Sequence, residues 1–155
     1  MTLLQFYSML HLLAVITWLG GMLFMNLILM PGMMALDPAQ RGALMGAVAK
    51  RFSIAAWGSV IVLLITGVLK TPPGMMFAPA SHYGGVLLLK HILIIIAIII
   101  GLTISVGVAP KLSKLAPKPG EAPSAEFISA QKKLKTLSTT NMIIGVCIVI
   151  VISLR

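Results

Sequence analysis

Residues 85–108 read GVLLLKHILIIIAIIIGLTISVGV, an apolar run interrupted only by Lys90, His91 and a few small polar residues. A helix needs about 20 apolar residues to cross the hydrocarbon core of a bilayer, and this run is long enough. Its isoleucines would favour a strand in water. In lipid, however, a lone strand leaves its backbone groups without hydrogen-bond partners, so we predict a membrane-spanning helix.

Three further apolar runs lie outside this stretch, at about residues 3–30, 52–69 and 136–154. We therefore predict an all-α integral membrane protein, an antiparallel four-helix bundle that forms one domain over residues 1–155. The first and third runs are expected to end at Pro31 and Pro110. Residues 35–51 are expected to form a separate short amphipathic helix that starts at Asp37-Pro38, and Ser124 is expected to cap a helix that continues into the fourth span.

The composition supports the same class, because 59% of the residues are apolar and only 10% are charged. Soluble domains are about one quarter charged. The net charge of +9 does not indicate a nucleic-acid-binding protein, since the basic residues gather beside apolar runs as they do on the cytoplasmic face of membrane proteins. The lone Cys147 cannot form an internal disulfide.

The basic residues also predict the topology. Four spans place the first and third connections on one side of the membrane, and only Lys70 and Arg155 fall on the other. We expect the more basic side to be cytoplasmic, so that both termini lie outside, in the inner membrane of a prokaryote. The basic residues of the cytoplasmic side are Arg41, Lys50, Arg51, Lys111, Lys114, Lys118, Lys132, Lys133 and Lys135.

Few ionisable residues fall within the predicted spans. The three carboxylates all lie in connections, which excludes an intramembrane carboxylate pair, whereas His11, Lys90 and His91 lie inside spans. His11 and His91 are each about 10–12 Å below the start of helices that run in the same direction. Two imidazoles at one depth are suited to hold a haem iron from opposite sides.

The leading hypothesis is therefore a haem b protein with His11 and His91 as axial ligands. It would serve electron transfer or redox chemistry near the outer face, with a redox partner or quinone, and an oxidoreductase activity is left open. Lys90 would pair with a haem propionate, or else snorkel to water or lipid phosphate. Trp18 shares a helix face with His11, and Gly21 would let a flat ring or another helix approach closely. Alternatively, each histidine only donates to a carbonyl of a neighbouring helix.

A second hypothesis concerns copper. Met75, Met76 and His82 lie in the predicted outer loop, and thioether and imidazole ligands together suit Cu(I). They would form an entry site of a copper-handling membrane protein. A third possibility is a non-catalytic structural or assembly protein whose histidines only pack. Under each hypothesis, glycine-rich helix faces predict a homodimer within the lipid bilayer.

Two segments carry a resemblance to known families. Residues 10–26 read LHLLAVITWLGGMLFMN, and residues 82–98 read HYGGVLLLKHILIIIAI. These helices resemble those of the copper-resistance CopD domain family and are similar to those of HemJ-type membrane haem proteins. The first resemblance implies copper uptake or resistance, and the second implies haem b binding and protoporphyrinogen oxidation. His11 and Lys90 fall on the motif positions.

Overall fold

The computed structural model describes residues 1–71, 82–118 and 120–153, with only the backbone described at residues 38, 39, 82 and 83. The chain is helical along four rods, each long and apolar enough to cross a membrane. The first rod consists of α1 (Leu3–Val15), η1 (Ile16–Gly20), α2 (Gly21–Phe24), η2 (Met25–Leu29), α3 (Met30–Gly32) and η3 (Met33–Ala35). The second rod is α4 (Pro38–Lys70), and the fourth is α7 (Ala125–Ser153). The third rod consists of α5 (His82–Leu102), η4 (Thr103–Val108) and α6 (Ala109–Lys114).

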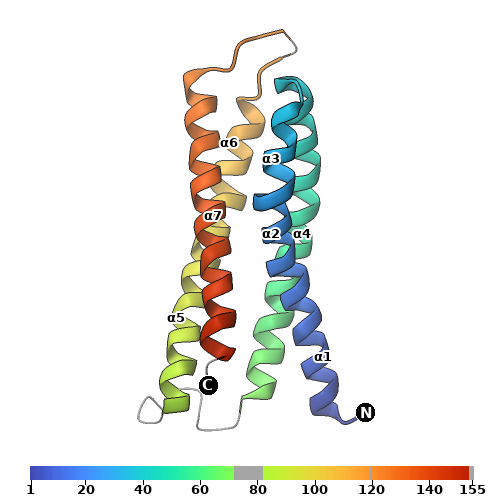
Figure 1. The fold of residues 1–155 in the computed structure, drawn as a ribbon, viewed down its shortest axis with the longest axis vertical. Helices are drawn as coiled ribbons and strands as arrows, with labels where there is room; N and C mark the ends of the chain where they lie inside the picture. Colours follow the sequence, from blue (N-terminus) through green and yellow to red (C-terminus); the bar gives the residue numbers. More distant parts are fainter. Residues whose placement is uncertain (72–81, 119, 154–155) are drawn as a thin grey trace.

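Consecutive rods run in opposite directions, so the two ends of the chain lie at the same end of the bundle (Figure 1). The predicted all-α four-span architecture is thus confirmed. The rods associate as two pairs, because α1 packs mainly on α4 and α5 packs mainly on α7. Contacts between the pairs are fewer and run chiefly from η1, α2 and η2 to α7. The space between the two pairs holds the candidate site.

The first and third rods are longer than the sequence predicts, since they continue past Pro31 and Pro110. Both expected ends were wrong for the same reason. A proline inside an α-helix removes one donor and crowds the carbonyl four residues back. Here a π-helical stretch precedes each proline, and the residue just before it, Met30 or Ala109, donates its N–H to a carbonyl five residues back. The wider turn accommodates the proline ring without ending the helix.

The second rod also departs from expectation, because residues 38–51 form no separate helix but continue into α4. Its predicted start is confirmed, with Asp37 as the N-cap residue and Pro38 in the first turn. The predicted cap of the fourth rod is confirmed as well. The Phe127 backbone N–H donates to Ser124 Oγ at 3.2 Å, and α7 then runs unbroken to Ser153.

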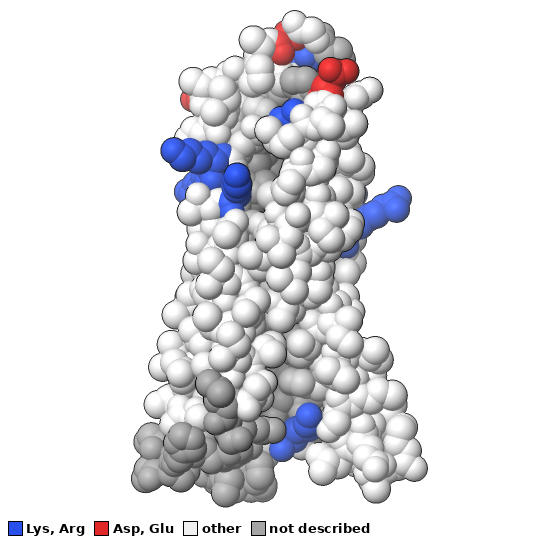
Figure 2. Space-filling model, in the orientation of Figure 1, with Lys and Arg blue, Asp and Glu red and all other residues white. Residues whose placement is uncertain are grey.

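The outer surface of the rods suits lipid. Large apolar side chains such as Val106 and Ile54 are 74% and 68% exposed. On the face drawn in Figure 2, a band without charged side chains separates the acidic and most of the basic side chains at one end from a basic side chain at the other. Rods of 29–33 residues span about 45 Å, more than the roughly 30 Å of a hydrocarbon core. The rods are therefore longer than the hydrocarbon core is thick. The homodimer stays a prediction.

Candidate functional site

A cavity of about 920 Å³ lies between the two helix pairs. Its wall extends from His11, Thr71 and Lys90 at the end near the termini to Met45 and Lys50 at the basic end. It therefore follows most of the length of the apolar spans. Its volume falls within the range of about 300–1,000 Å³ typical of ligand sites. No aspartate or glutamate lines it among the described residues.

The His11 side chain of α1 lines this cavity, and a side chain of α4 forms a hydrogen bond with its ring. His11 Nδ1 lies 2.7 Å from Thr66 Oγ1, and Thr66 is only 3% exposed. The Thr66 hydroxyl donates its one proton to the Val62 carbonyl at 2.6 Å. Its oxygen must then accept from His11, which assigns the proton of the neutral ring to Nδ1. Nε2 keeps its lone pair, the state in which an imidazole ligates a metal ion.

His91 of α5 lines the same cavity as His11. It follows the start of its helix by nine residues, and His11 follows the start of α1 by eight. The two residues therefore lie at similar distances along the chain from the starts of their helices. His91 Nδ1 is buried and has no hydrogen-bond partner among the described residues. A buried polar nitrogen without a partner is costly to the free energy of folding.

Of the other residues predicted for the site, some line the cavity and one does not. Trp18 and Lys90 line the cavity with the two histidines, whereas Gly21 is absent from its wall. A Cβ atom at Gly21 would clash with Cε2 of the Phe52 ring. Gly21 therefore serves the close packing of the first rod on α4, the second of the two roles that the sequence suggests for it.

The alternative copper site of the outer loop falls outside the description. Met75 and Met76 lie outside the described residues, and only the backbone of His82 is described, at the start of α5. Within the described ranges, no group of three or more His, Cys, Asp or Glu side chains is positioned to hold a metal ion. A metal site in the cavity would therefore have to combine imidazoles with other ligands.

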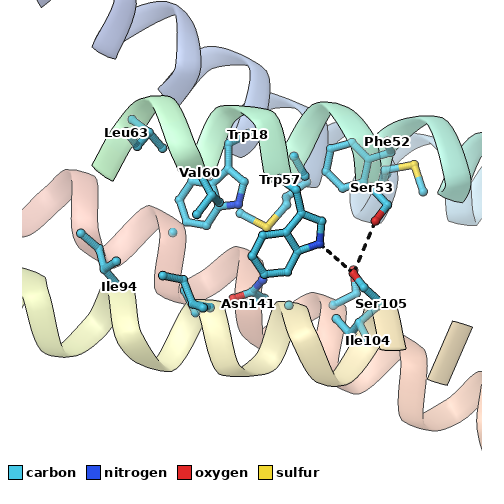
Figure 3. A pocket seen from close by; sticks show the side chains of 18 of the residues that line it. Trp18, Phe52, Ser53, Trp57, Val60, Leu63, Ile94, Ile104, Ser105 and Asn141 are labelled. Atoms are coloured by element: carbon cyan, nitrogen blue, oxygen red, sulfur yellow. Dashed lines mark hydrogen bonds between the residues drawn. The ribbon is translucent and has the colours of Figure 1, made fainter. Parts of the chain in front are cut away.

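Polar contacts join the rods toward the basic end. Figure 3 shows Trp57 of α4 reaching across to Ser105 of η4, where its indole Nε1 donates at 3.1 Å. Ser53 Oγ lies 3.4 Å from the same hydroxyl oxygen. Trp18 points into the same space, so both tryptophans of the chain lie in the cavity wall.

A second polar cluster connects the first rod to α7. Asn26 donates from Nδ2 to Ser138 Oγ at 2.9 Å and accepts from Thr139 Oγ1 at 3.4 Å. Ser138 and Thr139 thus form hydrogen bonds between helices. Nearby, Gly145 of α7 lets Leu19 and Met22 approach, with the Leu19 methyl Cδ1 only 2.9 Å from where a Cβ would stand.

Several residues of the cavity wall are not predicted from the sequence. Thr66 received no role, although a threonine in a span at the depth of His11 is a signal for a supporting hydrogen bond. Met30 and Met45 also received no role, yet both line the cavity together with Met22 and Met25. Their positions depend on which faces of the first rod and α4 turn inward, and only the packing settles that.

Comparison with known protein families gives a match to the family described as CopD, copper resistance protein D, over residues 46–155. The matched segment is well over half of the chain and includes Thr66, Lys90 and His91. It begins after the first rod, so His11 and Trp18 lie outside it. The resemblance to HemJ-type proteins is not shown. No curated protein and no solved structure matches the chain.

Proposed function

We propose that this chain, which belongs to the copper resistance protein D family, binds copper in its central cavity and conducts it through the membrane. The observation that carries the proposal is the cavity itself. It follows the length of the spans, and its wall offers imidazole and thioether ligands. Copper accepts both kinds of ligand.

The end of the cavity near the termini would be the copper-binding end. His11 presents a lone pair at Nε2 because Thr66 accepts from its other nitrogen, and His91 lines the same wall. An imidazole ligand usually has its second nitrogen fixed by such a hydrogen bond. The basic end would face the cytoplasm, following the distribution of lysine and arginine.

The direct test is metal analysis of the purified protein together with copper accumulation in cells. We expect copper to copurify with the wild-type protein and cellular copper to change when the protein is overproduced. His91→Ala should abolish both effects, while Thr103→Val, on the lipid-exposed side of the same rod, should preserve them. Wild-type protein that takes up no copper from a titration would overturn the proposal.

The orientation has its own test. Cys147 is the only cysteine, so a Cys147→Ala background allows single cysteines to be introduced. Gly120→Cys lies in the connection between α6 and α7 and should react with a membrane-impermeant maleimide only after the cells are opened. Thr2→Cys, at the opposite end, should react in intact cells.

A second candidate is haem b held by His11 and His91, which remains a proposal. It is favoured by the two histidines at similar depth on one cavity, with Lys90 in the same wall. The purified protein, supplied with haem during expression, should then show a Soret band that His11→Ala removes. Protein that binds copper and shows no Soret band would exclude haem and leave the copper proposal standing.

A further inference from the structure

Four methionines line the cavity on the side away from the histidines: Met22, Met25, Met30 and Met45. Along the first rod, Met22 and Met25 follow His11 by about 16 and 21 Å at the usual helical rise. Met30 follows it by about 28 Å, and Met45 precedes Thr66 on α4 by about 31 Å. Since Thr66 contacts His11, Met30 and Met45 lie at similar levels on neighbouring rods. The thioethers thus occupy two levels between the imidazoles and the basic end.

Met22 and Met25, the two methionines nearer the histidines, are also deeply buried. Met22 and Met25 are 5% and 7% exposed and stand three residues apart, so their side chains share one helix face. Buried methionine is commonly core filler. These two differ from other buried methionines of the chain: Met33 and Met142 are 4% and 9% exposed but do not line the cavity.

We propose that Met22, Met25, Met30 and Met45 form a row of Cu(I) sites that continues from the imidazole end, so that monovalent copper is the ion conducted. The inference rests on the proposed function. Thioether sulfur is a soft ligand that binds Cu(I) in preference to harder divalent ions.

The character of the cavity favours the monovalent ion independently of ligand type. The wall contains no carboxylate among the described residues that could neutralise a second charge. The cost of removing an ion from water into an apolar medium rises steeply with its charge. The faces of Trp18 and Trp57 in the same wall offer further stabilisation to a cation.

The tryptophans also provide the readout, because they are the only two in the chain and both line the cavity. The experiment uses the full-length protein in detergent, in a Cys147→Ala background that removes the one competing thiol. Ag(I), a redox-inert substitute for Cu(I), is titrated while tryptophan fluorescence is recorded. Cu(I) is then titrated under reducing conditions against a chromophoric chelator, and Zn(II) serves as the divalent comparison.

We expect Ag(I) and Cu(I) to quench the tryptophan fluorescence in a saturable manner. Zn(II) should not bind to the methionine row and should not quench the fluorescence. Met22→Leu/Met25→Leu should weaken Cu(I) binding by about 10–100-fold, since losing a ligand costs at least as much as losing its supporting partner. Met33→Leu/Met142→Leu, equally buried but away from the cavity, should bind as the wild type does. Thermal unfolding of both double variants checks that leucine preserves the packing.

The outcomes separate this inference from the proposed function. If the wild type binds Cu(I) and Met22→Leu/Met25→Leu binds it equally well, the methionine row is wrong and the copper function stands. If Zn(II) binds as tightly as Cu(I) and quenches equally, the assignment of the monovalent ion is wrong. If the wild type binds neither Ag(I) nor Cu(I), both proposals fall.

Discussion

The two ends of the cavity differ in whether their polar side chains have hydrogen-bond partners. Toward the basic end, Asn26 is paired with Ser138 and Thr139, and Trp57 is paired with Ser105. At the other end, His11 has a partner for one ring nitrogen, and His91 Nδ1 is buried without a described partner. Polar groups that bond between helices hold a membrane bundle together, whereas a buried group left unsatisfied costs stability.

This difference distinguishes polar side chains that stabilise the bundle from polar side chains that serve function. A protein under selection for stability alone would pair or remove His91, since an apolar residue of similar shape costs nothing in hydrogen bonds. Asn141 Oδ1, in the middle of α7, is the one other buried side-chain atom without a partner in the described part of the chain. Asn141, like His91, belongs to the cavity wall.

The largest expected effect comes from removing both imidazoles. His11→Ala/His91→Ala should lower copper affinity by more than about a hundredfold, because outer partners of a ligand alone are worth about 10–100-fold. The measurement is competition with a chelator of known affinity. Stability should respond in the opposite way: His91→Leu removes an unsatisfied buried nitrogen and should leave the unfolding midpoint unchanged or raised. A His91→Leu protein that is markedly less stable would mean that this histidine is a structural residue.

The next effect comes from the residue behind His11. Thr66→Val keeps the shape of the side chain but removes the oxygen that accepts from Nδ1. The ring is then free to change its orientation and its protonated nitrogen, and copper affinity should fall by about 10–100-fold. Thr66→Ser, which restores the hydroxyl, should recover most of it. Equal affinities for the valine and serine variants would show that the hydrogen bond does not position a ligand.

Sequence reasoning succeeded where local chemistry decides the outcome. The four spans follow from hydropathy, and the Ser124 cap and the Asp37-Pro38 start follow from residue type. It failed at Pro31 and Pro110, because whether proline ends a helix depends on a π-helical turn that no local rule predicts.

The site divides in the same way. Depth along a helix is a one-dimensional quantity, so the similar level of His11 and His91 could be predicted from the sequence. The facing of Thr66 toward His11, and of Met30 and Met45 toward the cavity, requires the rotation of each rod about its own axis. That rotation is fixed by close contacts such as Phe52 against Gly21.

A third prediction tests the contact that fixes this rotation. In Gly21→Ala, the new methyl group would clash with Cε2 of the Phe52 ring. Overpacking of this kind costs about 1–3 kcal/mol, to be measured as a lower unfolding midpoint by circular dichroism in detergent. Gly20→Ala is the matched control, since nothing lies within 4 Å of its Cβ position. Gly20→Ala should unfold at the wild-type midpoint or slightly above it. Equal midpoints for both variants would contradict the close approach.

The smallest effect is expected from a substitution toward the basic end of the cavity, where the polar side chains are hydrogen-bonded. Asn26→Leu removes both hydrogen bonds from the first rod to α7, and such bonds between membrane helices average about 0.6 kcal/mol each. The free energy of unfolding should therefore fall by roughly 1 kcal/mol while copper affinity stays at the wild-type value. Thr17→Val on the same rod controls for the loss of a polar group, because its hydroxyl bonds only to the Leu13 carbonyl of its own helix and faces outward. Should Asn26→Leu instead lower copper affinity as much as Thr66→Val does, Asn26 would itself belong to the copper path. The division between a structural and a functional end of the cavity would then be wrong.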